Sequence, residues 1–186
     1  MTLPESIREQ QSAAASGASA VTGVVGMSAI PESDRSASSL PDGDYADAFS
    51  IATDVIASPE QWARAMFGDI PNLAQQFIWR GLLGIRLSRG RSPRTVAGWR
   101  IAEQGEQWIR LEAGSWFLSA NLVVRGFDGR VSLATLVRYE RAVGRIVWPP
   151  LSAVHRLLIP GLLRAAVELR TREQRRADAA LRRPGQ

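Results

Sequence analysis

Residues 148–169 read WPPLSAVHRLLIPGLLRAAVEL, and this stretch decides the fold. Pro149 and Pro150 suit the first turn of a helix, where a backbone N–H has no intrahelical partner in any case. With successive residues about 100° apart around the axis, Arg156 and Arg164 fall opposite most of the large apolar side chains. The apolar side contains Leu151, Val154, Leu158, Leu162, Ala165, Ala166 and Leu169. The stretch therefore predicts an amphipathic helix that is long enough to cross a sheet.

His155, the single histidine of the chain, falls on the apolar side of this predicted helix. A histidine there is either a core residue with a hydrogen-bonded ring, or a polar group that anchors a ligand or transfers a proton. Thr135 and Tyr139 are the polar neighbours that a sheet could bring to it. Pro160 falls on the opposite side, where its missing N–H leaves the carbonyl of Arg156 to water and predicts a kink.

From residue 96 to residue 140, apolar residues recur at every second position, as in strands. Four strands are predicted, at 96–103, 107–117, 119–127 and 129–140, and an Asp-Gly pair marks a hairpin turn between the last two. One face contains Trp99, Ile101, Ile109, Leu111, Leu122, Val124, Val131, Leu133, Val137 and Tyr139. The other contains Arg100, Arg110, Glu112, Asn121, Arg125, Ser132, Arg138 and Glu140. This division predicts an antiparallel sheet with one covered face and one wet face.

Helices are predicted before these strands. Ser58 is a natural N-cap, Pro59 takes the first helical position, and Gln61 completes a capping box, so a helix is expected over 58–67. The apolar spacing over 73–85 predicts a second helix after a break, and alternation over 45–51 predicts a first strand.

The composition predicts three parts of the chain. Residues 1–29 are rich in Ala, Ser and Gly and are expected to be a disordered leader. Residues 30–170 are expected to form one domain, and residues 171–186 a basic tail. The leader has no secretory pattern, and residues 146–167 contain too many charges and prolines for an isolated membrane span. We therefore expect a cytoplasmic protein without a transmembrane segment.

The composition also excludes several kinds of site. The chain has no cysteine, which excludes disulfides, thiolate nucleophiles and thiolate metal sites. One histidine excludes a histidine-rich zinc site, and no phosphate-binding glycine loop or dinucleotide fingerprint is present. The sequence therefore predicts no metal and no cofactor.

Charge is distributed unevenly along the chain. Residues 1–54 carry eight acidic residues and two arginines, a balance of −6, so that the remainder carries +11. Six arginines and two acidic residues lie between 170 and 183. This segment is either a solvated helix end or a weak contact for an anionic surface. No aromatic residue lies between the arginines to stack on bases, so no specific nucleic-acid partner is expected.

The end of the predicted domain resembles a known group of proteins. Residues 133–168 are similar to the closing motif of an uncharacterised family within the START-like (SRPBCC) superfamily, and the resemblance extends over about 30–170. The matching residues are Ala134, Thr135, Gly144, Arg145, Trp148, Pro149 or Pro150, His155 and Ile159. The resemblance implies an α+β helix-grip fold, in which a curved antiparallel sheet wraps around a long C-terminal helix. The superfamily commonly has six strands, so residues near Gly114 and at 143–147 are expected to supply those that the pattern lacks.

The resemblance also implies a mostly apolar cavity between sheet and helix, because members of the superfamily bind lipids, hormones and polyketides. We expect a small apolar or amphipathic ligand there, bound without catalysis. The residues expected to line the site are Trp99, Leu111, Leu122, Thr135, Tyr139, Trp148, Leu151 and His155. The alternative is an enzyme of cyclase or dehydratase type, a minority activity of the superfamily, with His155 as acid or base. A third hypothesis is a partner-binding protein whose basic portion contacts an anionic surface.

Overall fold

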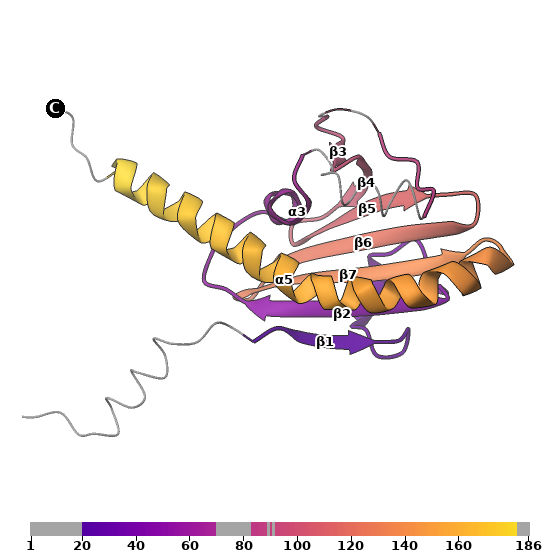
Figure 1. Ribbon diagram of the computed structural model, residues 1–186. Coiled ribbons are helices and arrows are strands. Elements are labelled where there is room, and N and C mark those ends of the chain that lie inside the picture. Colours follow the sequence, from indigo (N-terminus) through magenta and orange to yellow (C-terminus); the bar gives the residue numbers. More distant parts are fainter. Residues whose placement is uncertain (1–19, 70–82, 89, 91, 182–186) are drawn as a thin grey trace, which may run out of the picture.

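The chain forms one antiparallel sheet with a long C-terminal helix packed on it (Figure 1). The computed structural model describes residues 20–69, 83–88, 90 and 92–181. The sheet order is β1-β2-β7-β6-β5-β4-β3. The strands are β1 Thr22–Val25, β2 Tyr45–Ala52, β3 Thr95–Val96, β4 Trp99–Gln104, β5 Trp108–Gly114, β6 Leu118–Phe127 and β7 Arg130–Tyr139. The helices are α2 Glu32–Ser36, α3 Pro59–Phe67 and α5 Ala142–Leu181. The predicted α+β class is confirmed, and the arrangement is consistent with a helix-grip fold.

Three of the four predicted strands are confirmed as β5, β6 and β7, and the first, predicted over 96–103, is divided into β3 and β4 by a turn at Ala97 and Gly98. The hairpin between β6 and β7 turns at Asp128 and Gly129, which have φ values of 46° and 70°. These are the left-handed conformations that a tight hairpin requires, and Asp and Gly adopt them readily. The strand predicted over 45–51 is β2, which lies between β1 and β7, second in the sheet order. No strand comes from residues 143–147, which belong to α5.

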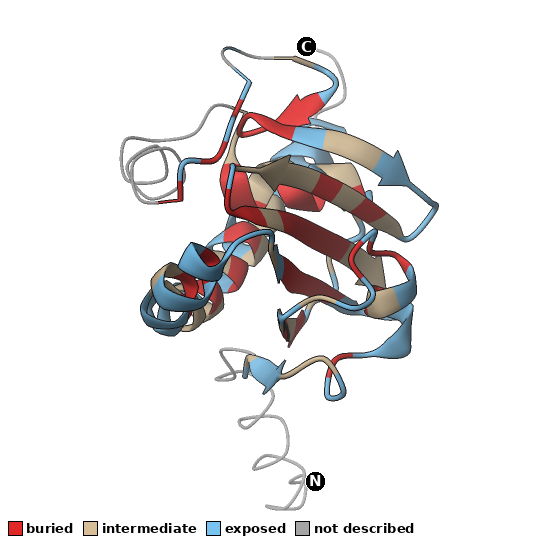
Figure 2. Cartoon of the chain, turned by 90° about the vertical axis from the view of Figure 1, so that its right-hand side faces the viewer, coloured by how far each residue is buried: buried red, intermediate tan, exposed pale blue. Residues whose placement is uncertain are grey.

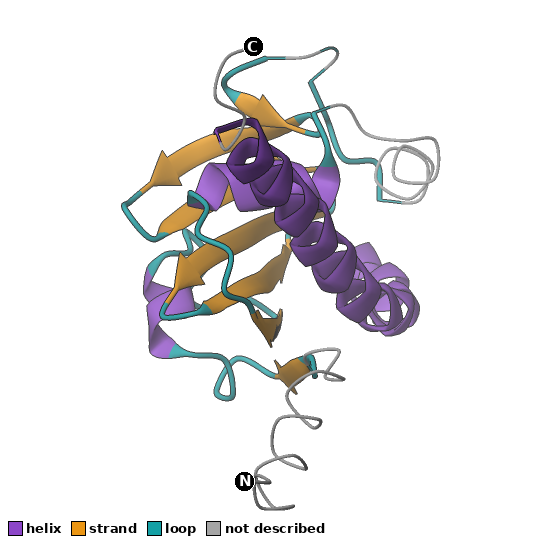
Figure 3. Cartoon of the chain, turned by 90° about the vertical axis from the view of Figure 1, so that its left-hand side faces the viewer, coloured by secondary structure: helices purple, strands orange, loops and turns teal. Residues whose placement is uncertain are grey.

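Both faces of the sheet carry apolar packing. On one face, α3 and α5 pack against alternate strand residues such as Ile51, Leu122 and Leu133. On the other, a segment that includes Ile30 and α2 packs against the intervening residues, such as Leu136. Figure 3 shows α5 crossing one side of the strands. The fold thus has three layers, with the thickest packing under α3 and α5.

The second face is therefore drier than the sequence predicts. Asn121 and Ser132 are buried, and the side-chain oxygen of Asn121 accepts hydrogen bonds from the Ser38 hydroxyl and the Ser39 backbone N–H. Charged residues of this face form ion pairs, such as exposed Arg138 with Glu140 and half-buried Arg110 with Glu112. The segment that covers the face has little regular structure, so its apolar residues gave no periodic signal.

The N-terminal part also differs from the sequence prediction. Residues 22–25 fall within the predicted disordered leader, but they form β1, which pairs with β2. Its four residues are all exposed, so backbone pairing rather than burial holds them. The helix predicted over 58–67 is confirmed as α3, including the capping box between Ser58 and Gln61. Most of the helix predicted over 73–85 lies outside the described residues, and its described end at 83–85 is not helical, with Gly84 at a φ of 59°.

Helix α5 begins at Ala142, seven residues before the predicted start, so all three prolines lie inside it. Pro149 and Pro150 deprive the carbonyls of Arg145 and Ile146 of their helical partners, but both residues are exposed, so water can replace those bonds. The helix remains continuous through Pro160. It also changes direction along its length and leaves the sheet at its C-terminal end (Figure 1).

The buried side of α5 is rotated from the predicted one. Its buried residues are Gly144, Trp148, Ser152, Ile159, Leu163 and Ala166, which span an arc of about 100° on a helical wheel. Val154, Leu158 and Leu169, predicted to be covered, are 48%, 55% and 44% exposed. Figure 2 shows the buried side of α5 toward the sheet and the exposed side away from it. The prediction failed because two sides of the helix are apolar, so the helical wheel alone does not show which of them packs on the sheet.

Candidate functional site

A polar cluster interrupts the apolar packing where α5 crosses β2 and β7. His155 Nε2 lies 3.0 Å from Oγ1 of Thr135 and 3.4 Å from Oδ2 of Asp47. The Tyr45 hydroxyl donates a hydrogen bond of 2.5 Å to the same Asp47 oxygen. The indole ring of Trp148 contacts both aromatic members of this cluster: its centroid lies 5.3 Å from that of the Tyr45 ring and 5.8 Å from that of the His155 imidazole. We call Tyr45, Asp47, Thr135, Trp148 and His155 the Asp47–His155 cluster.

The pairing of the strands places these groups together. Asp47 and Thr135 are direct cross-strand neighbours of β2 and β7, and Leu122 of β6 is the next residue in the same row. Neighbours in such a row have side chains on one face of the sheet, within contact distance. Trp148 and His155 are seven residues apart on α5, about two helical turns, so both face the sheet. The cluster is therefore fixed by rigid elements.

The imidazole nitrogen that bonds Thr135 also faces the carboxylate. If Nε2 carried no hydrogen, its lone pair would lie 3.4 Å from a carboxylate oxygen, which is repulsive. Asp47 therefore favours a hydrogen on Nε2, in either the neutral or the charged ring. A relay of the serine-hydrolase kind needs the acid and the hydroxyl on different ring nitrogens. Thr135 and Asp47 share one nitrogen, so this geometry is not such a relay.

Two polar atoms of the cluster lack a hydrogen-bond partner. Asp47 is fully buried, and its Oδ1 accepts no hydrogen bond. The Nε1–H of Trp148, which is 5% exposed, donates none. Buried polar atoms are nearly always paired, and an unpaired one destabilises the fold by roughly 1–3 kcal/mol. The cluster thus offers one acceptor and one donor for which the described residues provide no partner.

Charge in the cluster is partly balanced from α5. Against the larger effects of burial and of Asp47, the Arg156 guanidinium acts on the Tyr45 hydroxyl and lowers its pKa. Burial raises the pKa of Tyr45, and the Asp47 carboxylate beside it raises the pKa further, so this hydroxyl stays protonated and donates to Asp47. Arg156, predicted on the outer side of the helix, is half-buried because its long side chain reaches back to β2.

The eight residues expected to line a ligand site all belong to the apolar packing on the α5 face of the sheet or border it. Thr135, Trp148 and His155 meet in the cluster, and the expected contact between Thr135 and His155 is observed. Leu151 is half-buried and packs against the same apolar face. Tyr139 is the last residue of β7, and its ring packs against Gly144 in the first turn of α5. Trp99, Leu111 and Leu122 lie deeper in the core, between 0% and 4% exposed.

Two open grooves lie elsewhere on the described part of the chain. One, of about 480 Å³, follows the second face of the sheet and includes Arg86, Arg100, Glu112 and Arg138 in its lining. Glu112 neutralises part of this charge through its ion pair with Arg100. The other, of about 360 Å³, lies between the end of β2 and α5 near Thr171. None of the eight expected residues lines either groove.

Asp47 and Tyr45 are the cluster residues that sequence reasoning missed. Their alternation with Phe49 and Ile51 placed them on one face of a strand, and that face is the one under α5. The missing information was the pairing of β2 with β7 across more than eighty residues of sequence. Comparisons with protein-family models, curated proteins and solved structures find nothing similar to this chain.

Proposed function

We propose that this protein binds a small amphipathic molecule between the sheet and α5, without catalysis, with the polar end of the ligand at the Asp47–His155 cluster. The observation that carries this proposal is the pair of unpartnered buried atoms, Oδ1 of Asp47 and Nε1 of Trp148. A hydroxyl group can donate to the first and accept from the second. Convergent polar groups within an apolar wall are the usual design of small-molecule sites.

The position of the cluster supports the same proposal. The His155 side chain is 21% exposed, and Leu151 next to it on the helix is half-buried. The cluster therefore lies at the margin of the core. A ligand can approach there without crossing the packed centre around Leu111 and Leu133, both of which are fully buried. We also propose that the chain is a START-like protein, since sheet order and the C-terminal helix agree with that fold, and that it is cytoplasmic.

Native mass spectrometry of the protein from its own source, followed by titration with 1-decanol, tests the proposal. We expect a bound small molecule and a saturable change in tryptophan fluorescence. Trp148→Phe removes the free donor and should weaken 1-decanol binding by about fivefold to tenfold, whereas Trp116→Phe, at an exposed tryptophan, should not. Equal affinity of Trp148→Phe and Trp116→Phe for 1-decanol would contradict the site. So would a protein that carries no bound molecule from its source and shows no saturable binding of 1-decanol.

An enzyme with His155 as acid or base is the alternative, and the Asp47 carboxylate beside the ring favours it. Nε2 of His155 already contacts Thr135 and Asp47. Proton transfer to a substrate therefore requires Nδ1, or requires that the hydrogen bond between Nε2 and Thr135 breaks. His155→Gln discriminates between the two functions when the ligand recovered from the source is added back. A binding protein returns the ligand unchanged with both chains, whereas an enzyme converts it with the native chain alone.

A further inference from the structure

Helix α5 carries a second apolar side that no part of the described chain covers. Its members are between 37% and 80% exposed, and they fall within an arc of about 140° on a helical wheel. We call this surface the outer face of α5; it consists of Val143, Ile146, Val154, Leu157, Leu158 and Leu169. Monomeric soluble proteins rarely expose contiguous apolar surface of this kind without a function.

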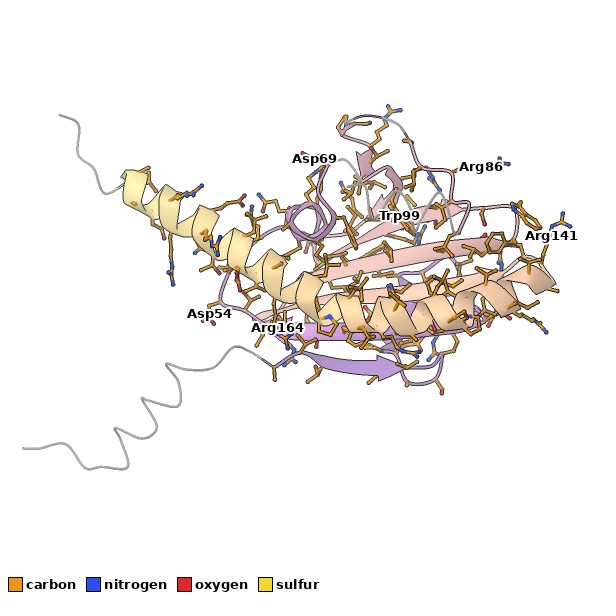
Figure 4. All side chains as sticks on the ribbon, viewed as in Figure 1. Asp54, Asp69, Arg86, Trp99, Arg141 and Arg164 are labelled. Atoms are coloured by element: carbon orange, nitrogen blue, oxygen red, sulfur yellow. The ribbon has the colours of Figure 1, made fainter. Side chains whose placement is uncertain are left out.

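The charge of the helix indicates what would cover this surface. Between residues 142 and 167, α5 contains no acidic residue, and Arg164 borders the outer face on a helical wheel, whereas Arg145 and Arg156 lie on other sides of the helix. Arg141 directly precedes it, and Arg172, Arg175 and Arg176 follow along the exposed C-terminal part, where they outnumber Glu173 and Asp178 and where Arg172 pairs with Glu168. Figure 4 shows Arg141 at one end of the helix and Arg164 farther along it. An apolar face accompanied by arginines is the pattern of helices that lie on anionic lipid surfaces.

An aromatic side chain beside the start of α5 agrees with this pattern. Trp116 is 58% exposed, the Arg141 guanidinium lies 5.9 Å from the centre of its ring, and Arg141 also donates to the Trp116 backbone carbonyl. Exposed tryptophan is typical of the boundary between water and lipid, because the indole ring is apolar and its N–H is polar.

Helix α5 is the one helix of the described residues that is long and apolar enough, by length and composition, to cross a membrane. Only 22% of its most apolar 18-residue window is buried. Its opposite side, however, packs on the sheet through Trp148, Ile159 and Leu163, and His155 bonds Thr135 there. Insertion across a bilayer would expose the sheet core to water. These contacts favour a helix that lies along the lipid surface.

We propose that the outer face of α5 docks the protein on an anionic lipid bilayer, with the apolar residues in the interfacial layer and the arginines against the headgroups. A second copy of the chain is the other conceivable partner. It would bring a second set of arginines against the first, and these like charges would repel each other. This proposal does not depend on the ligand site, because Trp148 and His155 lie outside the arc of the outer face.

Co-sedimentation with vesicles tests the proposal. The full chain should bind vesicles of phosphatidylcholine with phosphatidylglycerol at least about tenfold more tightly than phosphatidylcholine alone, and added salt should reduce the difference. Leu157→Asp should weaken binding to the anionic vesicles by about tenfold or more. Ile56→Asp is the matched control, because Ile56 is 92% exposed and lies outside α5. Arg164→Gln should weaken binding by about fivefold.

Leu157 and Arg164 are exposed, so both variants should retain the native circular dichroism spectrum and melting temperature, and a loss of binding then reports on the surface alone. Equal binding to neutral and anionic vesicles would overturn the proposal. A second result would also overturn it: the chain does not bind vesicles, light scattering gives it the mass of a dimer, and Leu157→Asp restores the mass of the monomer. That result would assign the outer face to a second copy.

Discussion

Asp34 in α2 is a carboxyl group in an unusual environment. It is 2% exposed against β6, and its Oδ1 lies 3.8 Å from Nε of Arg125 without a hydrogen bond. Burial raises the pKa of Asp34 from 3.8 to about 6, and the attraction to Arg125 offsets only part of that effect. The folded state therefore disfavours the negative charge relative to the neutral acid.

We predict that Asp34→Asn raises the free energy of unfolding by roughly 1–3 kcal/mol near pH 7. Because the folded pKa is raised, the stabilising contribution of Asp34 is complete below its unfolded pKa of 3.8 and is lost as the pH rises through about 6. The free energy of unfolding of the native protein should rise when the pH falls from about 7 to about 5, and the variant should lack the share of this rise that comes from Asp34. Urea unfolding of both proteins at both pH values measures these free energies. Identical pH dependence would contradict the raised pKa.

Asp47 differs from Asp34 although both are buried carboxyl groups. Asp47 accepts a hydrogen bond from the Tyr45 hydroxyl and faces His155, whereas the charged neighbour of Asp34 is Arg125 at 3.8 Å. A hydroxyl donor and an imidazole ring thus lie beside Asp47 where α5 crosses the sheet. This contrast is why the ligand proposal rests on Asp47, which holds a free oxygen within an otherwise organised cluster.

At the scale of elements, the start of α5 depends on Gly144. A Cβ at this position would lie 2.9 Å from Cδ1 of Tyr139 and 3.1 Å from the carbonyl oxygen of Phe117. These contacts are closer than van der Waals distance, so the first turn of α5 approaches the end of β7 only because the residue is glycine. The chain passes from Tyr139 in β7 to α5 within three residues, which leaves little freedom to relax.

We predict that Gly144→Ala destabilises the protein by roughly 1–3 kcal/mol, although alanine is the better helix former. Gly161 is the matched control in the same helix, because nothing lies within 4 Å of a Cβ added there. Gly161→Ala should stabilise the protein by up to about 1 kcal/mol. Thermal and urea unfolding of the two variants should thus shift in opposite directions. A stabilised Gly144→Ala would show that β7 and α5 separate easily.

Elements with a strong local pattern were predictable from the sequence. The strands between residues 99 and 139 alternate clearly, and the capping box of α3 fixes its start. The rotation of α5 was not predictable, because Leu157 and Leu158 on one side are as apolar as Ile159 and Leu163 on the other. Hydrophobicity alone cannot choose between two apolar sides when one of them faces outward.

At the scale of the whole molecule, the candidate site required tertiary information. His155 and Thr135 could be paired from the sequence because both belong to strong local patterns. Asp47 could not, since its contact with His155 depends on the pairing of β2 with β7. The second face is likewise covered by residues distant in sequence, Ile30, Ala37 and Leu40, which turn part of the predicted wet surface into a core. Local patterns therefore predicted the elements, and the pairing of distant strands determined the site.

The division of α5 between a packed part and a free part should be visible in local stability. Residues 172–181 are all exposed, whereas the part between Trp148 and Ala166 packs on the sheet every three or four residues. We predict that backbone amides of the packed part exchange with deuterium at least about 100-fold more slowly than those of 172–181, because the free part opens without exposing the core. Hydrogen-exchange mass spectrometry of the full chain measures this, with the β6–β7 hairpin as a slow internal reference. Uniform protection along α5 would contradict the prediction and would mean that the C-terminal part is covered in solution.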